Sequence, residues 1–94
     1  MAEVFPRKIK IVYDRNGCIG AAACVSINPI DWVMDADGKA NLIQSQKEAE
    51  KLVKIVDVNN KEEMGRVVES AIVCPVSIIE VWDVKENKRI VPAQ

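Results

Sequence analysis

Two stretches of this chain share one spacing of cysteine and proline positions. Residues 18–30 read Cys-Ile-Gly-Ala-Ala-Ala-Cys-Val-Ser-Ile-Asn-Pro-Ile, and residues 64–76 read Met-Gly-Arg-Val-Val-Glu-Ser-Ala-Ile-Val-Cys-Pro-Val. When their prolines are aligned, both stretches fit the frame C-x2-C-x2-C-x3-C-P, with several of the cysteines replaced. Each proline leads into an expected strand with a tryptophan nearby. The two stretches therefore indicate a diverged internal repeat.

Short elements are predicted around the first stretch. Residues 8–13 alternate polar and apolar side chains, a pattern typical of a half-buried strand. Residues 20–27 predict a short helix, which has to end before the following proline because proline disfavours helical backbone in the residue that precedes it. Two runs at 31–34 and 39–43 flank an Asp-Gly turn and predict a β-hairpin.

The segment after this hairpin is predicted to form a helix. Residues 47–56 show an amphipathic pattern with charged residues on one side. At helical spacing, Glu48 pairs with Lys51 and Glu50 pairs with Lys54 on the exposed face.

A second helix and two further strands are predicted toward the C-terminus. Residues 61–73 carry apolar side chains at helical spacing, and Asn60 is a suitable N-cap. Residues 77–82 predict a strand, and residues 89–91 predict another that pairs with it across a polar turn.

Together these elements predict an α+β fold in a single domain that spans residues 1–94. Val and Ile supply 25 of the 94 residues and Leu supplies two, which favours strands over a helical bundle. The order of elements matches a ferredoxin-like βαββαβ arrangement with small antiparallel sheets. The helix predicted above is then an inserted helix, within an insert at about residues 44–59.

Composition excludes several classes of function. The formal net charge is −1, so binding to nucleic acid has no electrostatic support. The chain has no histidine, which excludes Ser-His and Cys-His nucleophile pairs. No stretch approaches the roughly 18 apolar residues of a membrane span, and no signal peptide is visible. We therefore expect a cytoplasmic protein with no membrane partner, whose three cysteines are reduced and available for metal.

The cysteine frame resembles that of bacterial and archaeal-type ferredoxins. In that family each run supplies three ligands to one iron–sulfur cluster, and its Cys-Pro supplies a ligand to the other cluster. Carried over by position, Cys18 and Cys24 match the first and third ligands of one cluster, and Cys74 matches its remote ligand. The resemblance implies a single cluster, because the ligand positions of the second are Met64, Val67, Ser70 and Asn28. We expect ordinary helix packing to replace that second site.

One ligand position of the remaining cluster departs from the family. The second ligand of the frame is Ala21, which has no donor atom. Three thiolates are enough for a [3Fe-4S] cluster, whereas a [4Fe-4S] cluster leaves one iron without a protein ligand. The ligand count therefore favours [3Fe-4S], with [4Fe-4S] and a non-protein fourth ligand as the alternative.

The resemblance also implies which residues surround the cluster. Small side chains after the first cysteine let the backbone wrap closely around it, and Gly20 can take a positive φ. The expected surrounding residues are Ile19, Gly20, Ala21, Ala22, Ala23 and Pro75.

The function implied by the resemblance is that of a soluble one-electron carrier, not an enzyme. Its expected partners are redox proteins, such as a reductase, a cytochrome P450 or another oxidoreductase. Two alternatives stay open: a structural module that binds zinc through the same thiolates, and an interaction module on a ferredoxin fold without any cluster. Both alternatives predict a colourless protein.

Overall fold

A five-stranded antiparallel sheet forms one layer of the protein. The strand order is β4-β5-β1-β6-β7 in the computed structural model, which describes residues 6–18, 20, 23–73 and 78–91. The strands are β1 (Arg7–Tyr13), β4 (Gln46–Glu48), β5 (Lys51–Val58), β6 (Ile79–Asp83) and β7 (Lys88–Val91). Because β1 is central and pairs with both β5 and β6, the predicted N-terminal strand organises the whole sheet.

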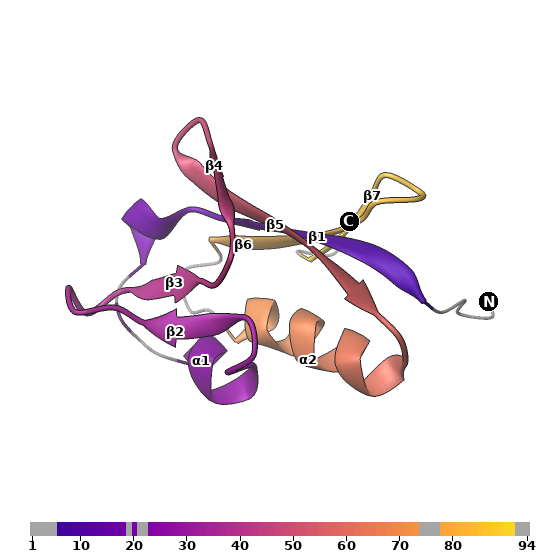
Figure 1. Cartoon of the computed structure of the whole chain (residues 1–94), viewed down its shortest axis with the longest axis horizontal. Coiled ribbons are helices and arrows are strands. Elements are labelled where there is room, and N and C mark those ends of the chain that lie inside the picture. Colours follow the sequence, from indigo (N-terminus) through magenta and orange to yellow (C-terminus); the bar gives the residue numbers. More distant parts are fainter. Residues whose placement is uncertain (1–5, 19, 21–22, 74–77, 92–94) are drawn as a thin grey trace.

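Two helices and a small hairpin lie on one side of this sheet (Figure 1). They are α1 (Ala23–Ile27), α2 (Lys61–Ile72) and the antiparallel pair β2 (Trp32–Met34) and β3 (Ala40–Leu42); a short 3-10 turn, η1 (Arg15–Gly17), follows β1. Helix α2 packs against β5, β6 and β7, and α1 packs against α2. The architecture is therefore α+β with small antiparallel sheets, as predicted.

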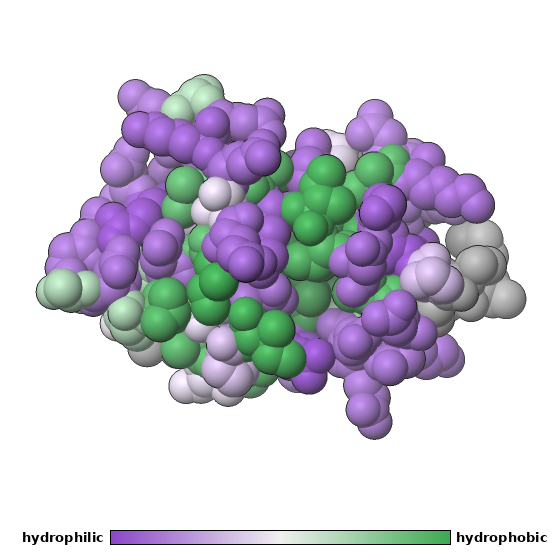
Figure 2. Space-filling model, in the orientation of Figure 1, coloured by the Kyte–Doolittle hydropathy of each residue, from purple (hydrophilic) through white to green (hydrophobic). Residues whose placement is uncertain are grey.

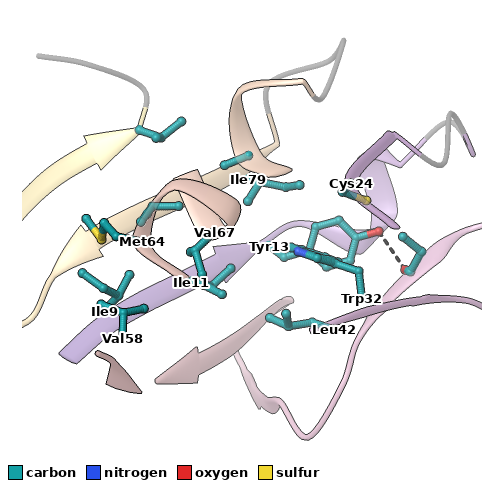
Figure 3. Packing of buried hydrophobic residues seen from close by; sticks show 14 residues of the cluster. Ile9, Ile11, Tyr13, Cys24, Trp32, Leu42, Val58, Met64, Val67 and Ile79 are labelled. Carbon is teal, nitrogen blue, oxygen red and sulfur yellow. Dashed lines mark hydrogen bonds between the residues drawn. The ribbon is translucent and has the colours of Figure 1, made fainter. Parts of the chain in front are cut away.

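Alternation along β1 places its apolar side chains in the core between the sheet and the helices. Ile9, Ile11 and Tyr13 are buried, as expected for every second residue of a half-buried strand. From the helix side, Met64 and Val67 of α2 are buried in the same hydrophobic cluster (Figure 3). The predicted periods of two for β1 and about 3.6 for α2 therefore meet in one core.

Three further local predictions agree with the structure in whole or in part. Helix α1 ends at Ile27, two residues before Pro29. The hairpin around the Asp-Gly turn pairs Trp32 with Leu42. The strand predicted at residues 89–91 is β7, and it pairs with β6 across the polar turn.

Helix α2 begins with local contacts that its own sequence encodes. The side chain of Asn60 accepts a hydrogen bond from the backbone N–H of Glu63 at 2.9 Å. In return, the Glu63 carboxylate accepts one from the backbone N–H of Asn59 at 2.7 Å. The first contact satisfies an N–H group that the first helical turn leaves without a partner, and the second binds the residue before the N-cap to that turn.

Glycine in the middle of α2 gives a direct test of helix propensity. Gly65 is exposed, and a Cβ placed there would have no atom within 4 Å. We expect Gly65→Ala to raise the free energy of unfolding by about 0.5–1 kcal/mol, because alanine loses less backbone entropy in a helix. Urea denaturation of the full chain measures this change. A lower stability would show that α2 has a neighbour at this position.

The predicted inserted helix is wrong. Residues 46–58 form a β-hairpin instead, in which β4 pairs with β5, and the chain reverses at Ala49, whose φ is 55°. β5 then pairs with β1 along the full length of β1, from Tyr13 opposite Leu52 to Arg7 opposite Val58. This β4–β5 hairpin is therefore an extension of the main sheet.

The charged pairs that suggested a helix have other roles in the hairpin. Glu48 and Lys51 face each other across β4 and β5. Lys54 does not pair with Glu50 but forms an ion pair with Asp31, whose carboxylate lies 2.7 Å from its Nζ. Opposite charges that are three or four residues apart can stabilise a helix. Here the β-branched residues of β5, and the pairing of β5 with β1, favour strands instead.

Candidate functional site

The two described cysteines lie close together in the chain, between β1 and the end of α1. Cys18 follows η1 and is partly buried, whereas Cys24 lies in α1 and is buried among hydrophobic residues. Gly20 lies between them, and Ala23 is the first residue of α1. The other predicted site residues, Ile19, Ala21, Ala22, Cys74 and Pro75, lie outside the described residues.

Tyr13, at the end of β1, is the common neighbour of both cysteines. Its side chain is only 1% exposed, and its ring meets Trp32 edge to face with 4.8 Å between centroids. Burial raises the pKa of the Tyr13 hydroxyl, and contact with Cys18 and the nearby Cys24 raises that pKa further. Figure 3 shows Cys24 beside Tyr13 and Trp32. Tyr13 therefore lies in the electrostatic surroundings of both cysteines, and its hydroxyl donates a hydrogen bond to the backbone carbonyl of Ala40 at 2.8 Å.

The surroundings of Cys18 favour a thiolate. Burial by itself raises the pKa of the Cys18 thiol, but the polar surroundings of the sulfur, chiefly the Tyr13 side chain and backbone groups of Ala40 and Gly20, outweigh it. The positive charge of Lys39 adds to these contacts, so the net effect is a pKa below the usual value. A thiolate is the form of cysteine that binds metal.

Charged side chains connect the cysteine segment, which runs from Arg15 to Asn28 and contains both described cysteines, to the turn between β2 and β3. Arg15 Nη2 donates to Asp35 Oδ2 at 3.0 Å and to Asp37 Oδ1 at 2.8 Å. Lys39 Nζ, from the end of the same turn, donates to the backbone carbonyl of Asn16 at 3.3 Å. Hydrogen bonds from Arg15 and from Lys39 therefore join the β2–β3 hairpin to the start of the cysteine segment.

A close backbone approach completes this connection. Gly20 has a φ of +78°, a conformation that other residues adopt rarely. A Cβ at Gly20 would lie 2.5 Å from the carbonyl oxygen of Gly38, so only glycine fits against the turn. The predicted positive φ of Gly20 is confirmed, and its partner is the β2–β3 turn.

The four positions of the absent second cluster are filled with buried side chains. Exposure is 9% at Met64, 4% at Val67, 1% at Ser70 and 0% at Asn28. Ser70 Oγ accepts a hydrogen bond from Trp32 Nε1 at 3.3 Å and donates one to the Val67 carbonyl at 2.7 Å. Packing and hydrogen bonds therefore replace metal ligands at these positions, as predicted.

Among the described residues, the two cysteines and the polar groups around them fit an iron–sulfur cluster. Soft thiolates are the ligands such clusters require, and hydrogen-bond donors around the sulfur atoms stabilise their negative charge. Cys18 has these donors, and the φ of Gly20 lets the backbone turn closely after it. Among the described residues there is no group of three metal-binding side chains, and Cys74 is outside that part of the chain.

Some neighbours of the cysteines were not predicted from the sequence. Tyr13 continues the inward alternation of Ile9 and Ile11, so its burial could have been expected. Its hydrogen bond to Ala40, and the contribution of Lys39 near Cys18, depend on the β2–β3 hairpin folding back over the cysteine segment. No local pattern in the sequence encodes that approach.

Comparisons with known proteins identify the class of this fold and site. Residues 11–81 match the model of a family described as a 4Fe-4S single cluster domain. A ferredoxin from Thermococcus litoralis is 38% identical over 42 residues, which cover 45% of this chain and 71% of the relative.

The fold, the cysteine segment and these matches define a single-cluster ferredoxin of the bacterial and archaeal type. The chain belongs to the 4Fe-4S single cluster domain family. Neither of the helices in the described part of the chain is long and apolar enough to cross a membrane.

Proposed function

We propose that this protein is a one-electron carrier that holds one iron–sulfur cluster through Cys18, Cys24 and Cys74. The main support is the match of residues 11–81 to the 4Fe-4S single cluster domain family. The positive φ of Gly20, which lets the chain turn between Cys18 and Cys24, agrees with it. A bound cluster supplies reversible transfer of a single electron. The protein's own residues bind it, exclude water and donate hydrogen bonds to its ligands.

The proposed cluster is [3Fe-4S]. Ala21 occupies the second ligand position and has no donor atom, which leaves three cysteines for one site. The alternative is a [4Fe-4S] cluster with a non-protein ligand on one iron. The buried residues at the positions of the second cluster support one cluster rather than two.

The proposed partners are redox proteins: a reductase as donor, and a cytochrome P450 or another oxidoreductase as acceptor. This assignment follows from the ferredoxin family, whose members transfer electrons and carry out no bond-making chemistry of their own. We place the carrier in the cytoplasm, where thiols are kept reduced and available for metal.

The proposed domain is the whole chain, residues 1–94, on a ferredoxin-like βαββαβ framework. In this interpretation β1, α1, β2, β3, α2 and β6 are the framework, and the hairpin β4–β5 is the insert. Its support is that β1 and β6 pair directly while the hairpin extends the sheet beyond β1.

Anaerobic purification tests the proposal. We expect a brown protein with about three iron atoms per chain and an EPR signal in the oxidised state, since an oxidised three-iron cluster is paramagnetic. An oxidised [4Fe-4S] cluster is silent, so a brown, EPR-silent protein would overturn the three-iron assignment. A colourless protein that contains zinc, or no metal, would overturn the proposed function.

The ligand set has its own test. We expect Cys74→Ser to lose the iron, because it leaves two cysteine thiolates for the cluster. Ser26→Ala is a matched control, because Ser26 is an exposed residue of α1, and it should retain the iron of the parent chain. Unchanged iron content in Cys74→Ser would remove that residue from the ligand set.

A further inference from the structure

One half of β5 has a free edge. Strand β4 pairs only with residues 51–53, whereas β1 pairs with β5 as far as Val58. In the part of the chain that the structure describes, no strand pairs with the other side of residues 54–58, and no loop backbone forms a hydrogen bond to it. On such an edge every second residue directs its N–H and C=O away from the sheet, where they can pair with another extended chain.

The two outermost strands of the sheet carry charges that protect their edges. Every residue of β4 is polar or charged and exposed, and β7 begins with Lys88 and Arg89. Charged residues on an edge strand discourage a further strand from pairing with it. In the free part of β5, Lys54 is instead turned toward Asp31, and Ile55 is 56% exposed. This part of β5 is therefore the edge best suited to accept another strand.

A groove of about 370 Å³ lies beside this edge. Its walls come from β5, from α2 and from the connection between α1 and β2, and its apolar lining residues are Ile30, Val56, Val58 and Val67. Figure 2 shows apolar side chains gathered along β5 and near the start of β2 on this side of the molecule. Side chains alternate between the two faces of a strand, so a chain paired with β5 would place every second side chain in the groove.

One charged side chain of the groove lacks a partner in the described part of the chain. The three carboxylates have partners, namely Lys54 for Asp31, Lys8 for Asp57 and the backbone N–H of Asn59 for Glu63. Arg66, from α2, is half-buried, and its side chain forms no hydrogen bond or ion pair with any other residue that the structure describes. A carboxylate on an incoming chain would supply that partner, because the guanidinium group binds carboxylates through two parallel hydrogen bonds.

We propose that the free edge of β5 and this groove bind an extended segment of a partner protein by strand addition. The segment has apolar side chains at alternate positions and one carboxylate for Arg66. Backbone hydrogen bonds hold it, and the groove selects its sequence.

The proposed site is separate from the cysteine segment. Val56 pairs with Ile9, four residues along β1 from Tyr13, so the site lies about 13 Å along the sheet from the end of β1 that leads to the cysteines. A partner can therefore be held here without contact with the cysteine segment. The inference goes beyond the proposed function and does not depend on a bound cluster.

Synthetic peptides test the site directly. The probe is a short peptide, blocked at both ends, that alternates threonine and valine and carries glutamate in place of the central valine. We expect it to slow amide hydrogen exchange in residues 54–58 of the full chain. Two versions that are N-methylated at alternate residues, along one edge or along the other, keep all side chains. Only one of them should bind, because strand addition uses one edge of the peptide.

Two substitutions test the side-chain contacts. Arg66→Gln should weaken binding by up to about fivefold, the effect of one partly exposed ion pair, and should not change binding of a peptide with glutamine in place of glutamate. Ile30→Ser should also weaken binding, because Ile30 lines the groove. Ile72→Ser is the matched control, since Ile72 has the same exposed fraction of 62% but does not line the groove. It should bind the peptide as the parent chain does.

The outcomes decide between occupants of the edge. Unchanged exchange in residues 54–58 with up to about 1 mM peptide would overturn the proposal, as would equal binding of both N-methylated versions. A dimer of the chain alone, with slow exchange in the same residues, would assign the edge to a second copy and would also overturn it. A chain that binds the peptide but holds no iron contradicts only the proposed function.

Discussion

Lys54→Met is expected to lower the free energy of unfolding by about 3 kcal/mol, the lower end of the range for breaking a buried ion pair. Lys54 Nζ lies 2.7 Å from Asp31 Oδ1, and the two side chains are only 12% and 10% exposed. The substitution leaves the Asp31 carboxylate buried without its counter-charge. The hydrogen bond from Asn28 Nδ2 to Asp31 Oδ2, at 2.7 Å, remains and limits the loss.

An exposed ion pair on the same sheet provides the control for Lys54→Met. Lys8 and Asp57 form a pair at 3.0 Å in which both side chains are 63% exposed. Lys8→Met should therefore change stability by no more than about 1 kcal/mol, because solvent screens such pairs. Urea denaturation of both variants measures the difference. Equal losses would mean that the Lys54 pair contributes no more than a surface contact.

This ion pair also explains how the hairpin insert is attached. Lys54 belongs to β5, whereas Asp31 precedes β2 and contacts Asn28, at the end of the segment that contains both described cysteines. The β4–β5 hairpin is therefore connected to the end of the cysteine segment by a buried polar contact, and to β1 by strand pairing. We expect Lys54→Met to loosen β4 and β5 before the rest of the sheet, which hydrogen exchange can measure.

Gly20→Ala is expected to lower the free energy of unfolding by at least about 2 kcal/mol, since both backbone strain and a steric clash oppose alanine. The φ of +78° is costly for any residue with a Cβ. In addition, the new Cβ would lie 2.5 Å from the carbonyl oxygen of Gly38, and a backbone atom cannot move aside as a flexible side chain can. The cysteine segment and the β2–β3 turn would have to separate.

Gly38→Ala separates the two causes. Gly38 has a similar φ of +83°, but a Cβ there would have no atom within 4 Å. Gly38→Ala should therefore lower the free energy of unfolding only by the conformational cost of a positive φ, about 1–2 kcal/mol. Thermal or urea denaturation measures the stability of the two variants, and the difference between their stabilities is the cost of the clash. Their iron content is measured alongside. Equal stabilities would show that the turn does not press on the cysteine segment.

The predictions from the sequence succeeded where neighbouring residues decide the structure. Helix α2 begins after Asn60 because the Asn60 side chain accepts a hydrogen bond from the N–H of Glu63 in the first turn, and both residues are local to the helix. The Asp-Gly turn at the β2–β3 hairpin and the helix end before Pro29 are equally local. These signals lie within a few residues of the element they specify.

The candidate site was predicted in part. Cys18 and Cys24 stand out because their spacing with a distant Cys-Pro follows a known ligand frame. Tyr13 was predicted only as a strand residue, and the contact of Gly20 with Gly38 could not be predicted at all. The hydrogen bond of Tyr13 to Ala40 and the approach of Gly20 to Gly38 both depend on a hairpin that begins several residues after the second cysteine and folds back toward the first.

The sequence by itself determined the capped helix α2, the tight turns and the alternation of β1, because each depends on neighbouring residues. It also determined the cysteine frame, because that spacing depends on ligand chemistry. The tertiary structure alone decided residues 46–58. There, charge pairs at helical spacing and β-branched residues favour different structures, and the local balance is close. Pairing of β5 with β1 supplies the backbone hydrogen bonds that select strands, and in this arrangement Lys54 reaches its partner Asp31.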